Sequence, residues 1–127
     1  MLHVVLSLLL VVPGMMGNTV GYLGKSVNLS SESNSTLKII KIEWSIFSNP
    51  TWIATYKDNV INTNRLQQFE NRLRLNSSTG DLEIRDLKKT DEMEYSVLIK
   101  YDTETQHNNK VKLIVTGKDI NYNHYSY

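Results

Sequence analysis

The stretch "TGDLEIRDLKKTDEMEYSV", Thr79 to Val97, decides the fold because it joins two strand-like segments through a polar turn. Its first half alternates apolar and charged residues, with the period of a strand that buries one face. Tyr95 stands four residues after Asp91, in position to bond its hydroxyl back to upstream backbone, which is the tyrosine corner of Greek-key sandwiches. We expect Asp91 to pair with Arg72 as a structural ion pair rather than as a catalytic group.

Segments of the same kind recur along the chain at intervals typical of an all-β sandwich. They are "SVNL" (26–29), "KIIKIEWSIF" (38–47), "TWIATYK" (51–57), "NRLRLN" (71–76), "YSVLIKY" (95–101) and "NKVKLIV" (109–115). No stretch carries a helical period longer than about two turns. The sequence therefore predicts an all-β fold of packed antiparallel strands.

Length and charge fix the broad class of protein. The chain has 127 residues, which is about one domain, and a formal net charge of +1 with 21% charged residues. Its Lys and Arg residues are scattered along the sequence, whereas a nucleic-acid binder needs a concentrated basic face. We therefore expect no nucleic-acid partner.

The N-terminal segment differs in composition from the rest. "VVLSLLLVV", 4–12, is apolar apart from one serine and is followed by Pro13 and Gly14. This pattern predicts a signal peptide over 1–17, rather than a buried strand or an anchor, and the run is too short to span a bilayer. We expect one domain over 18–117, a disordered tail over 118–127, and a location that is secreted or on the extracellular side of the plasma membrane.

Three parts of the sequence resemble the N-terminal V-type immunoglobulin domain of the SLAM family and related lymphocyte adhesion receptors. They are "EW" at Trp44, "NRLRLNSSTGDLEIRDLKKTDEMEY" (71–95) and "KVKLIV" (110–115), within a similarity that covers roughly 18–116. The resemblance implies a V-type Greek-key sandwich of two antiparallel sheets. It makes Trp44 the buried tryptophan of strand C, and Arg72, Asp91 and Tyr95 the structural Arg, Asp and Tyr of a V domain.

An immunoglobulin domain ordinarily joins its sheets by a disulfide, but this chain has no cysteine. The two cysteine positions fall at Ser31 and Val97. Distal domains of the resembled family often lack this bond, so the absence fits the resemblance. Val97 is an apolar filler, whereas the Ser31 hydroxyl either lies near solvent, if its strand ends early, or bonds to backbone.

Packing alone is expected to hold the sheets together, in a domain that is insensitive to reductant. The residues predicted to fill the core are Val27, Leu29, Ile40, Ile42, Trp44, Leu73, Leu75, Leu82, Ile84, Val97, Ile99, Val111, Leu113 and Val115.

Nothing in the sequence points to catalysis. The chain has no cysteine nucleophile, and its histidines are isolated: His3 in the leader, His107 in an expected loop and His124 in the tail. The carboxylates of the opening stretch lie on alternate strand faces and in a turn, so they do not converge as an acid/base pair. We expect no enzyme activity, no metal and no cofactor.

Function is then expected on a surface, which three N-x-S/T sequons help to locate. Asn28 and Asn76 are expected on the sheet of strands A, B, E and D, and Asn34 in the B–C loop. The opposite sheet, of strands G, F, C, C′ and C″, has no sequon along it and is the predicted binding face. Its expected outward residues are Lys41, Glu43, Ser45, Phe47, Ile53, Thr55, Lys57, Leu98, Lys100, Lys110 and Lys112.

Family members bind one another face to face through this sheet, so the resemblance implies immunoglobulin-like cell-surface proteins of the same family as partners, in self or heterophilic pairs. One reading is a recognition domain of an immune-cell receptor or its soluble form, which makes weak cell-cell contacts. The alternative is a structural homophilic adhesion module at cell junctions. A third, simpler reading is a solvated sheet face. The C-terminal "KDINYNHYSY" (118–127) leaves open a secreted single domain, a fragment, or half of a longer receptor.

Overall fold

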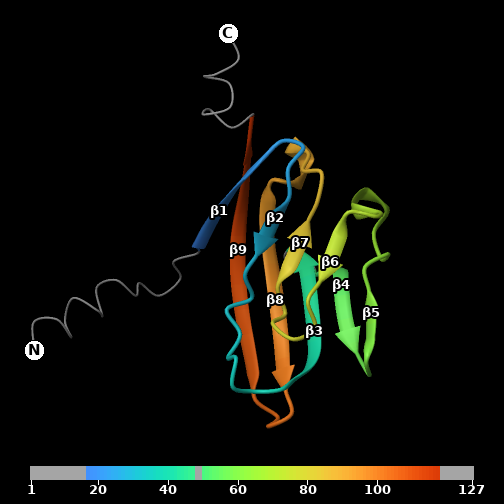
Figure 1. Cartoon of the computed structure of the whole chain (residues 1–127), viewed down its shortest axis with the longest axis vertical. Helices are drawn as coiled ribbons and strands as arrows, with labels where there is room; N and C mark the ends of the chain where they lie inside the picture. The colour runs from blue at the N-terminus through green and yellow to red at the C-terminus, as the bar shows by residue number, and fades with distance from the viewer. Residues whose placement is uncertain (1–16, 48–49, 118–127) are drawn as a thin grey trace, which may run out of the picture.

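A computed structural model describes residues 17–47 and 50–117 of the chain. Residues 1–16 of the predicted signal peptide 1–17, the tail 118–127, His3 and His124 lie outside the described residues. Within them, the chain forms two layers, in which strands β2, β7 and β6 overlie the middle of a larger sheet (Figure 1). This confirms the predicted two-sheet sandwich without a disulfide.

The described residues form nine strands and two short 3-10 helices. They are β1 (Gly17–Tyr22), β2 (Val27–Leu29), β3 (Ile39–Ile46), β4 (Thr51–Lys57), β5 (Val60–Asn62), η1 (Gln67–Phe69), β6 (Leu73–Leu75), β7 (Leu82–Ile84), η2 (Lys89–Asp91), β8 (Met93–Tyr101) and β9 (Gln106–Thr116). The larger sheet has the order β1-β9-β8-β3-β4-β5, and the smaller has the order β2-β7-β6. In immunoglobulin nomenclature, β2 to β9 correspond to strands B, C, C′, C″, D, E, F and G.

Strands β3 and β8 form the centre of the core because both alternate apolar and polar residues over most of their length. They pair antiparallel with Trp44 opposite Val97, the residue at the second cysteine position. Trp44 is fully buried, and its indole Nε1 donates a 2.7 Å hydrogen bond to the Gly80 carbonyl. Packing and one hydrogen bond therefore join the two sheets where a disulfide ordinarily does.

One predicted core residue is wrong. Ile40 is 38% exposed, and Ile39 occupies the core in its place. The pairing of β3 with β8 shifts register between Ile39 and Lys41, so an additional residue interrupts the alternation there. Strict period-two counting back from Trp44 therefore places this end of the strand on the wrong face.

The first strand also differs from expectation, because it joins the larger sheet and not the sheet of B, E and D. β1 runs parallel to β9, with Gly17 opposite Val111 and Tyr22 opposite Thr116. Gly21 lies buried against Leu87, and a side chain at this position has no room. This strand therefore covers the β9 edge of the larger sheet.

Candidate functional site

The outer face of the larger sheet can be built from the register of its strands, one row of side chains at a time. Lys41 on β3 lies opposite Lys57 on β4 and opposite Lys100 on β8. These residues, here called the lysine row, place three cations side by side. Like charges directly opposite one another destabilise a sheet. The only carboxylate within ion-pair distance of the row, among the described residues, is Glu43, at 3.6 Å from the Lys41 Nζ.

The next row is polar except for one leucine. Glu43 lies opposite Thr55 on β4 and opposite Leu98 on β8, which in turn lies opposite Asn108 on β9. Arg65, from the loop after β5, donates from Nε to the Thr55 hydroxyl at 3.0 Å, which adds a further cation over this face. The row therefore contains one carboxylate beside several hydrogen-bonding groups.

A hollow follows, because the third row has two small residues at its centre. Ser45 on β3 and Ser96 on β8 lie directly opposite each other, with Trp52 beside Ser45 and Lys110 beside Ser96. We call this hollow the serine trough. A volume of about 520 Å³, lined also by Phe47, lies over it. A second volume of about 470 Å³ shares both serines and extends past Trp52.

Trp52 is a residue of this face that the sequence analysis missed, and Ile53 was placed on it wrongly. Trp52 is 46% exposed, whereas Ile53 is fully buried. The register between β3 and β4 shifts between Trp44 and Ser45, so Ile53 and Ala54 both point inward. The alternating signal in "TWIATYK" fails at this bulge, because two consecutive residues face the core.

Phe47, just after β3, is the most exposed large apolar side chain of the described residues, at 65%. Its φ of 68° lies in the left-handed region, which a bulky residue seldom adopts. Six other non-glycine residues of the described chain also have a positive φ, among them Asp58 and Asn59 of the β4–β5 turn, so this conformation belongs to the turn after β3. Phe47 therefore holds a large apolar group in solvent at the margin of the serine trough.

The remaining outward residues of the predicted face lie on β8 and β9. Glu94 lies opposite Lys112, and its carboxylate is 3.7 Å from the Lys110 Nζ. Lys110 and Lys112 are exposed, while Leu98 and Lys100 are half-buried. Of the predicted face residues, the structure thus brings all but Ile53 together on one surface, and adds Trp52 and Ser96.

All three sequon asparagines are exposed on other parts of the molecule. Asn28 lies on β2 opposite Glu83, in the smaller sheet, and Asn76 follows β6. The Asn34 Oδ1 accepts hydrogen bonds from the Thr36 backbone N–H at 2.9 Å and the Thr36 hydroxyl at 2.6 Å. The strands of the larger sheet contain no sequon.

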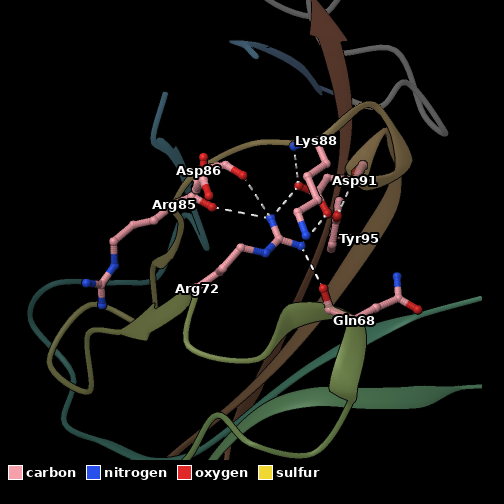
Figure 2. Close-up of polar contacts among 7 residues, drawn as sticks. All are labelled: Gln68, Arg72, Arg85, Asp86, Lys88, Asp91 and Tyr95. Atoms are coloured by element: carbon pink, nitrogen blue, oxygen red, sulfur yellow. Dashed lines mark hydrogen bonds and ion pairs between the residues drawn. The ribbon is translucent and has the colours of Figure 1, made fainter. Parts of the chain in front are cut away.

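A buried charged cluster supports the sandwich at the start of β6 (Figure 2). The Arg72 guanidinium donates from Nη1 and Nη2 to the two carboxylate oxygens of Asp91, at 2.7 and 2.9 Å. The Tyr95 hydroxyl donates to the Asp91 carbonyl at 2.6 Å, which is the predicted tyrosine corner. The hydrogen bond to Asp91 raises the pKa of Arg72, and burial, followed by the Asp91 charge, raises the pKa of Tyr95 far above its ordinary value. The structural role of these groups stays a prediction.

A second cluster surrounds Ser31, at the first cysteine position. The Ser31 backbone N–H donates to the Asp81 carboxylate at 2.9 Å. Strand β2 ends at Leu29, yet Ser31 is fully buried, and its hydroxyl donates to the Thr79 carbonyl at 2.5 Å. Of the two expectations for this hydroxyl, the backbone bond is the one observed. His107 lies on β9 and not in a loop, and its Nε2 is 2.8 Å from the Ser31 carbonyl.

Neither cluster has the arrangement of a reactive site. Among residues 17–47 and 50–117, no group of three or more His, Asp or Glu side chains is placed to hold a metal ion. Every buried side-chain nitrogen and oxygen of the described chain has a hydrogen-bond partner. No helix in this part of the chain is long and apolar enough to cross a membrane. The outer face of the larger sheet is therefore the candidate functional site.

Comparison with known proteins gives matches in structure only. No protein-family model matches the chain, and no curated protein matches it in sequence. The first immunoglobulin-like domain of human CD48 superposes with a TM-score of 0.74 at 19% identity, over 86% of this chain and 88% of that one. CD84, described as a SLAM-family structure, gives 0.68 at 18% identity, over 82% of this chain and 100% of that one.

A third similar structure is the extracellular domain of the voltage-gated sodium channel beta4 subunit, with a TM-score of 0.58 at 16% identity, over 86% of this chain and 98% of that one. Its parallel homodimers are described as explaining that protein's role in cell-cell adhesion. Likeness at these identities establishes the fold. The chain thus has the fold of an immunoglobulin V domain without an intersheet disulfide, similar in structure to CD48 and CD84.

Proposed function

We propose that this chain is an extracellular recognition domain of an immune-cell surface receptor, or its soluble form, that binds other immunoglobulin-like surface proteins weakly and without catalysis. The observation that carries the proposal is the serine trough, flanked by the exposed Trp52 and Phe47, on the sheet that has no sequon. Binding interfaces are enriched in exposed aromatic side chains that fill hollows of a partner.

Three further observations support the use of this face. The sequons lie elsewhere, so glycans at Asn28, Asn34 and Asn76 leave the face open. The predicted signal peptide supports secretion or surface display. Similar structures come from a SLAM-family protein and from an adhesive channel subunit.

A glycan placed on the face is the direct test. Lys110→Thr converts "NNK" at 108–110 into the sequon N-x-T at Asn108, an exposed residue of β9. Lys110→Val is the matched control. Valine has nearly the same shape as threonine, and this variant also loses the Lys110 cation but creates no sequon. Fluorescent tetramers of the glycosylated domain should stain leukocytes, the Lys110→Val tetramer should stain more weakly, and the Lys110→Thr tetramer should not stain.

Adding Asn108→Gln to Lys110→Thr removes the new sequon and should return staining to the level of Lys110→Val. Equal staining by Lys110→Thr and Lys110→Val, with the new glycan verified by mass, would exclude this face. The proposal also fails if no tetramer stains any leukocyte.

The alternative, a structural homophilic adhesion module, is favoured by the beta4 homodimers. Cells that display the domain itself separate the two readings in the same experiment. Staining of these cells alone supports the junctional module, whereas staining of leukocytes alone supports the recognition domain.

A further inference from the structure

The lysine row suggests what kind of partner docks on this face, an inference that rests on the proposed function. Lys57, Lys41 and Lys100 belong to three different strands and meet only through the register of the folded sheet. Directly opposed like charges weaken strand pairing. A folded domain that keeps three of them in one row gives up some stability at a surface where an approaching carboxylate would relieve the repulsion.

Charge across the whole outer face points the same way. Six cationic side chains lie on the strands or over them, namely Lys41, Lys57, Arg65, Lys100, Lys110 and Lys112. The two outward carboxylates on these strands are already near lysines of the same face, Glu43 at 3.6 Å from Lys41 and Glu94 at 3.7 Å from Lys110. Acidic residues of the flanking turns, Asp58, Asp102 and Glu104, form no ion pair with the row within the described ranges.

A second copy of this chain is a poor occupant of such a face. In a two-fold interface the same patch is contributed by both subunits, so each cation must find a carboxylate of the same patch. Here six cations share the face with two outward carboxylates on the strands. Both carboxylates are already near lysines of the same face. Like-charge juxtaposition across an interface is unfavourable and excludes wrong partners.

We propose that the partner is a different protein whose docking surface is net acidic, with carboxylates against the lysine row and an apolar or small polar projection in the serine trough. The exposed Trp52 and Phe47 beside the trough favour a protein over an acidic polysaccharide, because a polysaccharide offers no apolar side chain to bury against them.

Single charge reversals test this in the tetramer assay. Lys57→Glu and Lys100→Glu should each lower leukocyte staining at least tenfold, and wild-type staining of fixed cells should fall as ionic strength rises. Lys25→Glu, in the exposed turn after β1, changes net charge equally and should alter staining less than about twofold. Lys41→Gln should lower staining while leaving the melting temperature equal to wild type or higher, because it removes the repulsion within the row.

The outcomes separate the inference from the proposed function. If Lys110→Thr abolishes staining but both lysine reversals behave like Lys25→Glu, the face binds and the acidic partner is wrong. The inference is also overturned if cells displaying the domain itself are stained and Lys110→Thr prevents it, or if removal of sulfated glycans or sialic acids from leukocytes abolishes staining. If no leukocyte is stained, the proposed function fails and the inference fails with it.

Discussion

The two ends of the β6–β7 hairpin are joined to the rest of the sandwich by different chemistry. At one end, Arg72 and Asp91 form a buried ion pair that the Tyr95 corner completes. At the other, the hydroxyl of Ser31 and the indole of Trp44 donate to consecutive carbonyls of the turn between the strands. One end therefore depends on a buried ion pair. The other, the turn end, depends on hydrogen bonds, one of them from the Ser31 backbone N–H to the Asp81 carboxylate, and on close packing around a glycine.

The difference shows how the fold is kept without a disulfide. The Gly80 carbonyl of the turn takes the place of a covalent link between the layers, because the Trp44 indole, from β3 of the larger sheet, donates to it. Ser31, which follows β2, donates to the Thr79 carbonyl within the smaller layer. Each such bond contributes on the order of 1 kcal/mol, which is less than a disulfide typically gives. Removal of one partner of the buried ion pair is therefore expected to cost more stability than removal of one hydrogen bond at the turn.

The largest effect is expected from Asp91→Ala. It leaves the Arg72 guanidinium buried without its carboxylate, and removal of one partner of a buried pair costs about 3 to 5 kcal/mol. Arg85→Ala is the control, because its ion pair with Glu83 at 3.5 Å is exposed and such pairs contribute about 0 to 1 kcal/mol. Denaturant unfolding followed by tryptophan fluorescence gives the free energy of unfolding of both variants. Similar losses of stability in the two would show that the Arg72–Asp91 pair matters no more than an exposed one.

Sequence predicted this charged end well, although only the Asp91–Tyr95 corner follows from a short spacing, since Arg72 lies 19 residues before Asp91. The spacing of Asp91 and Tyr95 is local, and it fixes the corner. The lysine row was not predicted as a unit, since its three residues meet only through the register of three strands. Ile40 and Ile53 were misplaced for a related reason, because a bulge adds one residue to a strand and reverses every later face.

The next effect is expected from Gly80→Ala, which tests close packing at the turn end. Gly80 has a φ of +80°, and a Cβ there would lie 2.6 Å from the Ile99 Cδ1 and 3.1 Å from the Ser31 Oγ. Gly24→Ala is a matched control, since Gly24 has a φ of +78° with nothing within 4 Å of an added Cβ. We expect backbone strain to lower the free energy of unfolding by about 1 to 3 kcal/mol in either variant. Gly80→Ala alone should lose more, because its Cβ also meets Ile99 and Ser31. Equal unfolding free energies for the two variants would show that the turn can move away from Ile99.

A smaller effect, with a characteristic pH dependence, is expected from Tyr95→Phe. The change leaves the buried Asp91 carbonyl without the phenol donor, at about 1 to 3 kcal/mol near neutral pH. The folded pKa of Tyr95 is raised, so its contribution is fully present below the unfolded pKa of 10.0 and is lost as pH rises above that value. The gap between wild type and variant in urea titrations should therefore shrink above about pH 10, and a gap independent of pH would argue that burial does not perturb this phenol.

The smallest effect is expected from Ser31→Ala, although the position is fully buried. The Thr79 carbonyl also accepts a hydrogen bond from the Ser33 hydroxyl at 2.6 Å, so it keeps a partner when the Ser31 hydroxyl is lost. A loss of about 1 kcal/mol is then expected, whereas Ser31→Ala combined with Ser33→Ala leaves the carbonyl without either donor and should lose more than the sum of the single changes. A double-mutant cycle measures this coupling. Additive losses would mean that water replaces the hydroxyls, and that this end is held by the Trp44 bond and by packing.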